Sequence, residues 1–404
     1  MTKNSFIDGN WYYIEYNAIK YFTCKVYALY YVKILAKIMS LKCGIVGLPN
    51  VGKSTLFNAL TATQAAEAAN FPFCTIEPNT GIVNIPDERI TKIADLAHSE
   101  KIIPNILEFV DIAGLVAGAS KGEGLGNQFL ANIRETDAII HVVRCFEDSD
   151  VTHVSGSIDS LRDVEIIETE LMLADLESLT KRLPNLAKKA KNNKDLAAEL
   201  AIAEQIIKFL EAGQPARKFI PQTDIESKLF KQLQLLTSKK LLYVCNVAED
   251  EVSTGNNESA KIFNYAKENN SSAINISAKI EAEIATLETK EEKQEFLETL
   301  GLKETGLARI IKESYKLLNL ITFFTAGPKE ARAWTLKAGS LAPNAAGVIH
   351  TDFEKGFIKA DTISYADYIA YGGEKPAKEA GKLRQEGKEY LVQDGDIFHF
   401  KFNN

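Results

Sequence analysis

Short apolar runs recur along the middle of the chain, and helical patterns separate them. The runs place Ile, Val and Leu on consecutive positions, which is typical of strands that are buried on both faces of a parallel sheet. They occupy residues 41–46, 105–110, 137–143, 240–247 and 272–276. Strands that alternate with helices in this way predict a doubly wound α/β sheet, whose ligand site lies at the carboxyl ends of the strands.

A long charged block interrupts this rhythm between Asp163 and about Leu210. Its apolar positions keep mostly three- or four-residue spacing, and a lysine-rich turn at residues 188–194 divides it. The positions are Ile166, Leu173, Leu176, Leu179, Leu183 and Leu186. The pattern predicts a helical hairpin, inserted into the sheet domain over about residues 160–238. Its charged surface is either a solvated face that closes an apolar seam or an arm that touches a polyanion.

The pattern changes again after Asn319, where short strand-like runs alternate with glycine-rich turns. The runs are residues 321–326, 332–337, 356–363, 389–393 and 396–402, and residues 378–386 have a helical pattern. This arrangement predicts a small, β-rich α+β domain over residues 319–403. The sheet domain with its insertion then takes residues 39–318.

Residues 1–38 differ in composition from the rest, since seven of the chain's 14 tyrosines lie there. Their most apolar stretch, residues 26–32, is too short to cross a bilayer and has lysines on both sides. A signal-peptide core with a small-residue cleavage site is missing as well. We expect Met39 to be the true initiator; an interfacial membrane anchor and a genuine ordered or disordered tail are the alternatives.

The composition is that of a soluble globular protein: 404 residues, 46% hydrophobic and 25% charged. A net charge of −7 argues against a generic polycationic nucleic-acid binder, so contact with RNA needs a local basic patch and DNA is not an expected partner. The five cysteines are scattered without a CxxC pair, which favours a reducing cytoplasm over a zinc site or a disulfide framework. Of these, Cys43 and Cys74 flank the phosphate-binding motif described next, and we interpret both as packing groups.

The stretch GLPNVGKS at residues 47–54 follows the first apolar run and precedes a helical pattern. In that context it predicts a phosphate-binding loop, whose backbone N–H groups and helix N-terminus hold the phosphates of a nucleotide. Lys53 then reaches the β and γ phosphates, and Ser54 offers an oxygen to Mg²⁺. The predicted nucleotide-binding residues of this loop are Asn50, Val51, Gly52, Lys53, Ser54 and Thr55. Asn50 either braces the loop or ligates a K⁺ ion beside the phosphates.

A second motif, DIAG, begins at Asp111 directly after a predicted strand. Its carboxylate can hold Mg²⁺ through water, and the N–H of Gly114 can sense the γ phosphate. Thr75 is either a further Mg²⁺ ligand or an ordinary loop threonine. Five glycines between residues 114 and 126 predict a mobile switch segment.

Leu115 stands where common GTPases carry the glutamine that orients the attacking water. Leucine can neither donate nor accept a hydrogen bond, so hydrolysis is slow or another group positions the water. The candidates are His141, Arg144 and His153. The strand pattern around His141 favours a core histidine, whereas His153 lies in a predicted loop.

The base site differs from that of guanine-binding proteins, which use Asn-Lys-x-Asp at the end of a strand. Here the strand ends in Asn246-Val-Ala-Glu249, so the lysine is replaced by Val247 and the aspartate by a longer glutamate. Two lost hydrogen bonds of roughly 1.5–3 kcal/mol each would remove guanine preference, while Asn246 could still bond an adenine. Ser277, in Ser-Ala-Lys, resembles the usual second base loop. We therefore predict ATP as the substrate, with an ordinary GTPase as the alternative.

In combination, the motifs across residues 41–403 resemble the YchF-type ribosome-binding ATPases, a branch of the Obg-related GTPases. The motifs are GLPNVGKST, FPFCTIEPN, DIAGLVAGASKGEGLGN, HVVRCF, NVAED, TAGPKEARAWT and AGVIHTDFEKGFIKA. The resemblance implies an Obg-type domain with a coiled-coil hairpin, a C-terminal TGS domain of β-grasp type, and Mg²⁺-dependent hydrolysis of ATP to ADP and phosphate. It also implies binding to the ribosome or its large subunit, contact of Val247 with the adenine, and a hydrolytic role for His153. Residues 1–38 have no counterpart in it.

The resemblance leaves two kinds of function open. One is a slow ATPase switch, in which the bound nucleotide changes the surface offered to the ribosome. The other is a ribosome-binding adaptor with incidental hydrolysis. The second is motivated by the basic hairpin turn, which contains Lys188, Lys189, Lys191 and Lys194.

Overall fold

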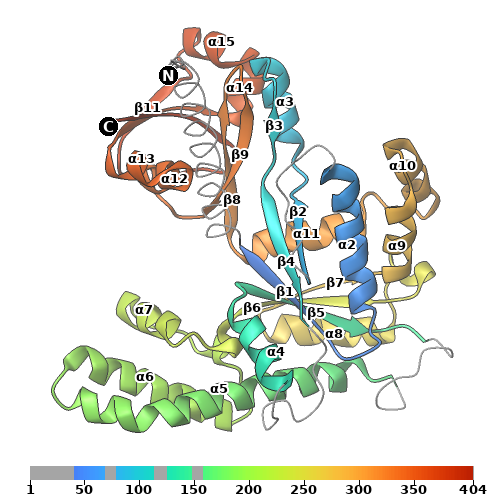
Figure 1. Cartoon of the computed structure of the whole chain (residues 1–404), viewed down its shortest axis with the longest axis vertical. Helices are drawn as coiled ribbons and strands as arrows, with labels where there is room; N and C mark the ends of the chain where they lie inside the picture. Colours follow the sequence, from blue (N-terminus) through green and yellow to red (C-terminus); the bar gives the residue numbers. More distant parts are fainter. Residues whose placement is uncertain (1–40, 69–78, 113–124, 148–157, 404) are drawn as a thin grey trace, which may run out of the picture. The chain divides into compact units, whose positions relative to one another are not determined.

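A computed structural model describes residues 41–68, 79–112, 125–147 and 158–403 of the chain. Two six-stranded sheets organise these residues. Figure 1 shows the first sheet at the level of β1, β5 and β6, and the second sheet around β8 and β9. Residues 1–38 lie outside the described residues, and so does the predicted switch segment up to residue 124; its last two residues belong to helix α4 (Leu125–Arg134).

The first sheet has the strand order β2-β4-β1-β5-β6-β7. Its strands are β1 (Lys42–Val46), β2 (Thr80–Asn84), β4 (Ile106–Asp111), β5 (Ala138–Arg144), β6 (Lys240–Asn246) and β7 (Ser272–Ile276). All neighbours pair in parallel except β2, which is antiparallel to β4. The five predicted strands are confirmed, and the continuous burial of β5 agrees with its apolar run. The edge strand β2 was not predicted from the sequence.

Helices flank this sheet, with α2 and α11 above it and α4, α5 and α8 below it in Figure 1. The flanking helices outside the insertion are α2 (Lys53–Ala68), α4 (Leu125–Arg134), α8 (Asn257–Glu268), α9 (Ala278–Thr286), α10 (Lys290–Thr299) and α11 (Gly306–Leu317), and a short 3-10 turn η3 spans Glu249–Glu251. The predicted α/β class is therefore confirmed, and strands β1, β4 and β6 point their carboxyl ends at one edge.

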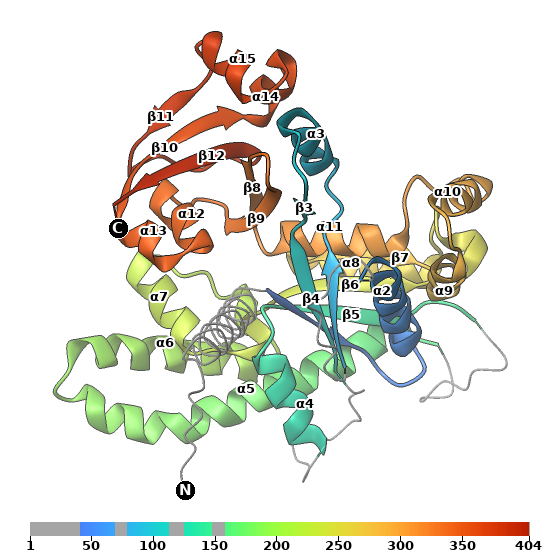
Figure 2. The same cartoon turned by 45° about the horizontal axis from the view of Figure 1, so that its top comes forward.

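The predicted helical hairpin is present as α5 (Ser160–Ala190) and α6 (Lys194–Glu211), seen side by side in Figure 2. Asp159 caps the start of α5, and Asn193 in the turn caps α6 through bonds to the N–H groups of Asp195 and Leu196. The insertion continues through η1 (Ala216–Lys218), α7 (Asp224–Gln232) and η2 (Leu236–Ser238).

An apolar seam holds the hairpin together, and its buried members include Leu179, Ile202 and Ile206. Leu176, Leu183 and Leu186 pack against this seam as predicted. Leu173 does not, because its side chain is 39% exposed on the outer side of α5.

The second sheet has the order β11-β10-β12-β8-β9-β3. Its strands are β3 (Ile102–Ile103), β8 (Leu320–Ala326), β9 (Ala331–Lys337), β10 (Phe357–Ser364), β11 (Arg384–Glu386) and β12 (Asp396–Phe402). Four of the five predicted runs in this region are strands. The fifth, residues 389–393, contributes only an isolated bridge between Leu341 and Leu391. Short helices accompany the sheet, namely α12 (Ala342–Ile349), α13 (Thr351–Lys355), α14 (Tyr365–Tyr371) and α15 (Glu374–Glu379).

The helix predicted over residues 378–386 is wrong. Helix α15 ends at Glu379, and Gly381 follows with φ of 72°, a left-handed conformation that terminates helices. The chain then forms β11, which pairs antiparallel with β10. A helical stretch and a strand therefore share the segment in which only a helix was predicted.

Residues 85–105 leave the first sheet after β2 and return to it at β4, and in between they join the second sheet. Helix α3 (Glu88–Ala97) buries Ile90 and Ile93 in a cluster that also contains Phe324 and Ile397. Strand β3 pairs in parallel with β9. This excursion was not predicted from the sequence, and it connects the two sheets covalently at a second place.

Among the helices of the described ranges, none combines the length and the apolar character needed to cross a bilayer.

Candidate functional site

The loop between β1 and α2 is held by its own apolar side chains and by its glycines. Leu48 and Val51 are buried in the core of the sheet, while Asn50 is exposed. A Cβ atom on Gly47 would lie 2.6 Å from the carbonyl oxygen of Val142, so a side chain does not fit there. Asn50 and Gly52 have φ angles of 62° and 93°. These constraints force the loop to turn sharply before the first turn of α2.

Helix α2 begins at Lys53, and its first turn closes when the N–H of Leu56 donates to the carbonyl of Gly52 at 3.0 Å. The N–H groups of the first helical residues have no partner within a helix, and the helix dipole places a partial positive charge there. The side chains of Ser54 and Thr55 are exposed at this turn. The loop and the turn together offer an anion site of the size that the predicted motif requires.

Asn246, at the end of β6, connects this loop to the start of α9. Its Nδ2 donates to the carbonyl of Val51 at 3.0 Å, and its Oδ1 accepts from the N–H of Ala278 at 2.9 Å. A Cβ atom on Gly52 would lie 2.3 Å from Nδ2, which explains why glycine stands at that position. Both ends of the Asn246 amide are therefore bonded to the chain itself, and the amide has a second N–H and a second lone pair with which the predicted bond to a base could form.

Asp111 lies at the end of β4, beside Ile45 in the neighbouring strand. Its Oδ1 atom is buried and has no hydrogen-bond partner among the described residues. Burial raises the pKa of this carboxyl group, and the positive charge of Lys53 opposes part of that increase. A buried carboxylate oxygen without a partner is unfavourable unless a cation or water approaches it. Asp111 and Ser54 thus fit a Mg²⁺ ion, which prefers oxygen ligands and keeps several waters.

Two loops flank the position that a base would take. Glu249 in η3 forms an ion pair with Lys279 in the first turn of α9. Both side chains are exposed, to 43% and 71%. Ser277 caps α9 by accepting from the N–H of Ile280, so its hydroxyl serves the helix. Val247, which the family resemblance places against the adenine, is 2% exposed in the core.

Of the three candidates for positioning the attacking water, His141 and Arg144 are buried side chains of β5. His141 is buried between strands, 5.7 Å from the ring of Tyr243. Burial, with a smaller contribution from the charge of Arg217, lowers the pKa of His141 to about 3. It is the core histidine that the pattern favoured. Arg144 is also buried and lies 4.6 Å from the Phe146 ring centre.

Three predicted site residues, Thr75, Gly114 and His153, lie outside the described residues. Of the two cysteines that flank the phosphate-binding motif, Cys43 is fully buried, and burial raises the pKa of its thiol to about 12. That confirms the packing role assigned to Cys43. The described ranges contain no cluster of three or more His, Cys, Asp or Glu side chains that could hold a metal alone.

The geometry places the protein among the P-loop nucleoside triphosphatases, because a glycine-shaped loop, Lys53 and Asp111 converge at the carboxyl edge of a parallel sheet. Residues 42–174 match a family model described as "50S ribosome-binding GTPase". Residues 320–403 match the model of the C-terminal region of YchF GTPases, described as "Protein of unknown function (DUF933)". The chain belongs to the YchF family.

Individual relatives support this assignment along nearly their whole length. The chain is 56% identical over 368 residues to the protein named Ribosome-binding ATPase YchF of Bacillus subtilis (strain 168), covering 90% of this chain and 100% of that protein. Identity to the protein of the same name from Escherichia coli O157:H7 is 54% over 366 residues, with the same coverage. The solved structure of the Schizosaccharomyces pombe YchF GTPase has a TM-score of 0.81 and 40% identity, covering 90% of this chain and 98% of that one.

Proposed function

We propose that this protein is a Mg²⁺-dependent ATPase that prefers ATP to GTP, binds the ribosome through its large subunit, and acts in the cytoplasm as a nucleotide-dependent switch in translation. Within it, residues 39–318 are the Obg-type domain, with the hairpin insertion over about 160–238, and residues 319–403 are the TGS domain. The observation that carries the proposal is the unpartnered Oδ1 of Asp111 beside Lys53 and the anion-binding turn of α2.

In this proposal the phosphates and the metal bind at the carboxyl edge of the first sheet. The N–H groups from Val51 to Thr55 and the Lys53 ammonium hold the β and γ phosphates, while Ser54, Asp111 and Thr75 hold Mg²⁺. When bound, the metal neutralises charge on the phosphate oxygens during transfer to water. Gly114 senses the γ phosphate and His153 is the proposed water-positioning residue. Asn50, with its left-handed backbone, is the proposed ligand of an additional K⁺ ion.

Preference for adenine over guanine is supported by the ion pair that already occupies the carboxylate of the base loops. A guanine-binding site presents a free carboxylate to the N1–H and N2–H groups of the base. Here the Glu249 carboxylate is engaged by Lys279. Two missing hydrogen bonds to guanine are worth about 10²-fold or more in affinity. The names of the relatives differ on this point, since some are called ATPases and one a GTPase.

Hydrolysis is tested with a single substitution at the phosphates. The wild type is expected to release phosphate from ATP slowly in the presence of Mg²⁺, and Lys53→Ala to abolish the release. Lys261→Ala is the matched control, because Lys261 is an exposed lysine paired with Glu258 on α8. Phosphate release that persists in Lys53→Ala at the wild-type rate would place the reaction at another site.

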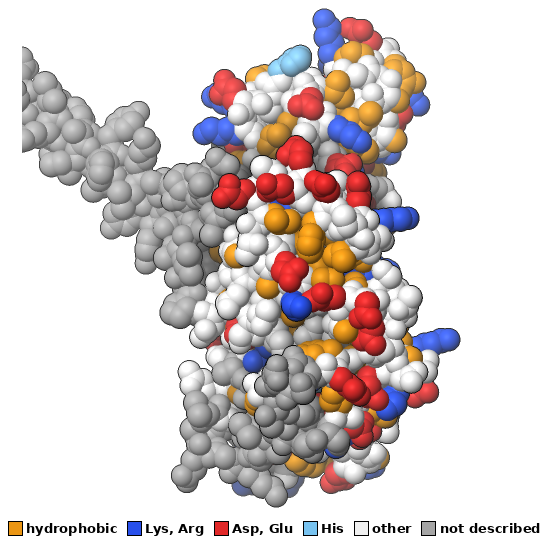
Figure 3. All heavy atoms as spheres, turned by 90° about the vertical axis from the view of Figure 1, so that its right-hand side faces the viewer, with side chains coloured by type: hydrophobic (Ala, Val, Ile, Leu, Met, Phe, Trp, Pro, Cys, Tyr) orange, Lys and Arg blue, Asp and Glu red, His pale blue; other side chains and the backbone are white. Residues whose placement is uncertain are grey.

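Ribosome binding is supported by the relatives' name and by the charge of the hairpin turn. Lys188, Lys189, Lys191 and Lys194 are exposed there, and no ion pair is found for them among the described residues. Acidic side chains instead mark the face drawn in Figure 3, on which α10 lies. Phosphate groups of ribosomal RNA would be attracted to the hairpin turn and repelled from that face.

Cosedimentation with ribosomes at increasing salt tests this contact. Binding is expected to weaken steeply with salt, and replacing the four lysines by glutamate is expected to weaken it further. Glutamate at four exposed lysines elsewhere, Lys228, Lys231, Lys337 and Lys378, is the control. Binding that is insensitive to salt and to the hairpin substitutions would exclude the turn. Equal affinity with and without ATP would favour an adaptor over a switch.

A further inference from the structure

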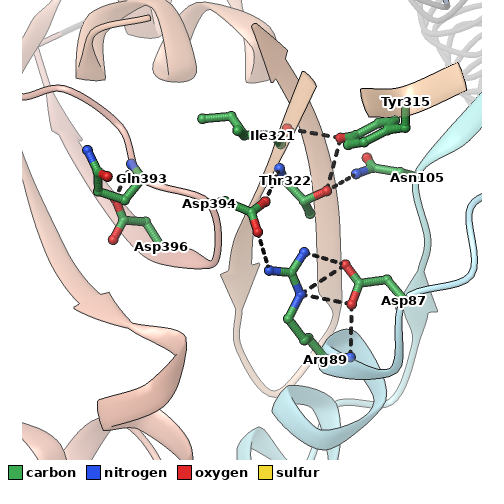
Figure 4. A network of polar contacts seen from close by, with 9 residues as sticks. All are labelled: Asp87, Arg89, Asn105, Tyr315, Ile321, Thr322, Gln393, Asp394 and Asp396. Atoms are coloured by element: carbon green, nitrogen blue, oxygen red, sulfur yellow. Dashed lines mark hydrogen bonds and ion pairs between the residues drawn. The ribbon is translucent and has the colours of Figure 1, made fainter. Parts of the chain in front are cut away.

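A polar junction connects the excursion of residues 85–105 and helix α11 to the second sheet (Figure 4). It consists of Arg89, Asn105, Tyr315, Thr322 and Asp394, and we call it the Thr322 junction. Thr322 lies in β8, and its side chain points to Asn105 and Tyr315 in Figure 4. The nucleotide chemistry proposed above uses none of these residues.

Thr322 is the centre of the junction. Its Oγ1 accepts from Nδ2 of buried Asn105 at 3.2 Å and lies 2.9 Å from the hydroxyl of Tyr315. The same hydroxyl is 2.9 Å from the carbonyl oxygen of Ile321. The N–H of Thr322 donates to Oδ1 of Asp394 at 2.8 Å. One threonine therefore joins three segments that are distant in the sequence.

Arg89 completes the junction from helix α3. Its guanidinium donates to Oδ2 of Asp394 at 2.6 Å and to both carboxylate oxygens of Asp87 at 2.7 to 3.1 Å. The carboxylate of Asp394 thus bridges Thr322 of the second sheet to α3 of the excursion. Because Arg89 follows β2 after only a short connection, the junction reaches the edge of the first sheet as well.

Asn105 is connected through a single strand, β4, to the part of the nucleotide site where the metal would bind. Strand β4 begins at the next residue and ends at Asp111, so a continuous strand of about 20 Å joins the junction to that carboxylate. The pairing of β4 with β1 and β2 makes this strand a rigid element, so Asn105 and Asp111 are held at a fixed separation.

Tyr315 leads to the base end of the same site. It lies in α11, whose first N–H groups, those of Gly306 and Leu307, donate to the buried carboxylate of Glu281 at 2.7 and 3.1 Å. Glu281 belongs to α9, the helix that starts at Ala278 with the bond to Asn246. A second chain of rigid elements therefore connects the base loops to Thr322.

We propose that the Thr322 junction couples the nucleotide site to the second sheet, so that bound nucleotide changes the stability of β8 and β12. Asn105 and Thr322 are buried, whereas Arg89 and Tyr315 are half-buried and Asp394 is exposed. Leaving a member of the buried Asn105–Thr322 pair without its partner is unfavourable, so this pair switches between paired arrangements rather than deforming gradually. The inference rests on the proposed nucleotide binding. Coupling is reciprocal, so a partner that binds the second sheet changes ATP affinity by the same factor.

Hydrogen exchange of the full chain, with and without saturating ATP and Mg²⁺, tests the coupling. Thr322→Val removes the hydroxyl at nearly constant shape, and Thr322→Ser retains it. Thr362→Val is the matched control, since Thr362 is also buried, in β10, and within the described part of the chain its hydroxyl bonds to Ala360 of its own strand alone. ATP affinity of each variant is measured separately by calorimetry.

In the wild type, ATP is expected to change exchange in β8 and β12 peptides by at least about twofold. Thr322→Val is expected to lose most of this response while ATP affinity stays within about threefold, and Thr322→Ser and Thr362→Val to retain it. A full response in Thr322→Val, or no response in a wild type that binds ATP normally, would overturn the inference and leave the proposed function intact. A wild type that does not bind ATP would contradict both.

Discussion

Replacing Asn246 by alanine removes both hydrogen bonds that connect the phosphate loop to the start of α9. The carbonyl of Val51 and the N–H of Ala278 are then left without their buried partner. Unsatisfied buried groups cost about 1–3 kcal/mol each, so the free energy of unfolding should fall by about 2–6 kcal/mol. The larger effect should be on nucleotide affinity, because the phosphate loop and the start of α9 would no longer be held at a fixed distance from each other.

If holding the loop and α9 at this distance contributes about 2–3 kcal/mol to the free energy of nucleotide binding, its loss lowers ATP affinity by about 30- to 150-fold. Denaturant unfolding measures the first quantity and isothermal titration calorimetry the second. Asn269→Ala is the control, because Asn269 is buried at the end of α8 and bonds the carbonyl of Tyr265, away from the nucleotide site. It should lose stability and keep its ATP affinity. Equal ATP affinities for the Asn246→Ala variant and the wild type would refute the bracing role.

Three further changes have defined outcomes. Asp111→Asn removes the charge from a carboxylate with a buried, unpartnered oxygen, so the nucleotide-free protein should melt about 2–4 °C higher. In the same variant Mg²⁺ should no longer strengthen ATP binding. A lower melting temperature would contradict the account of the unpartnered oxygen. The pKa of His141 is about 3 in the folded protein and 6.5 for an ordinary histidine. Between these pH values the imidazole is protonated in the unfolded chain but not in the folded one, so the free energy of unfolding falls as the pH is lowered below 6.5. Between pH 6.5 and 5 the wild type should lose about 2 kcal/mol more than His141→Gln, whereas exposed His399→Gln should behave as the wild type. Lys279→Ala frees the Glu249 carboxylate, so calorimetry should show a gain in GTP affinity of up to about fivefold, and an unchanged ATP-to-GTP ratio would remove the ion pair from base selection.

The first sheet and the phosphate loop were predictable because their signals are local. The apolar runs of β1, β5 and β6 need only neighbouring residues to be recognised, and GLPNVGKS combines glycine positions with a strand before it and a helix after it. Asp111 followed from its place at a strand end. The same reasoning found the hairpin turn at residues 188–194 through its helical periodicity on both sides.

The role of Asn246 was not predictable, because its partner Val51 is 195 residues away in the chain. Comparison with guanine-binding motifs predicted a bond from this side chain to the base, and the structure adds its bonds to the phosphate loop and to α9. The Glu249–Lys279 pair likewise depends on two loops meeting in space. Burial of Val247 follows from its bond to Ile276 in the adjacent strand, which no local pattern reveals.

The excursion of residues 85–105 was missed for a different reason. Strand β3 has only two residues and is stabilised by pairing with β9, more than 200 residues later. Helix α3 is amphipathic, but the surface that covers Ile93 belongs to the second sheet. By contrast, the end of α15 has a local signal in Gly381, whose left-handed backbone is typical of the residue that follows a helix.

The most direct test of the account is a calorimetric titration of the full chain with ATP and with GTP, in saturating Mg²⁺. An adenine-selective site behind an intact phosphate loop predicts ATP binding about tenfold or more tighter than GTP, with both affinities lost in Lys53→Ala. GTP binding as tightly as ATP would contradict the proposed base selection. Nucleotide affinity that survives Lys53→Ala unchanged would contradict the site itself.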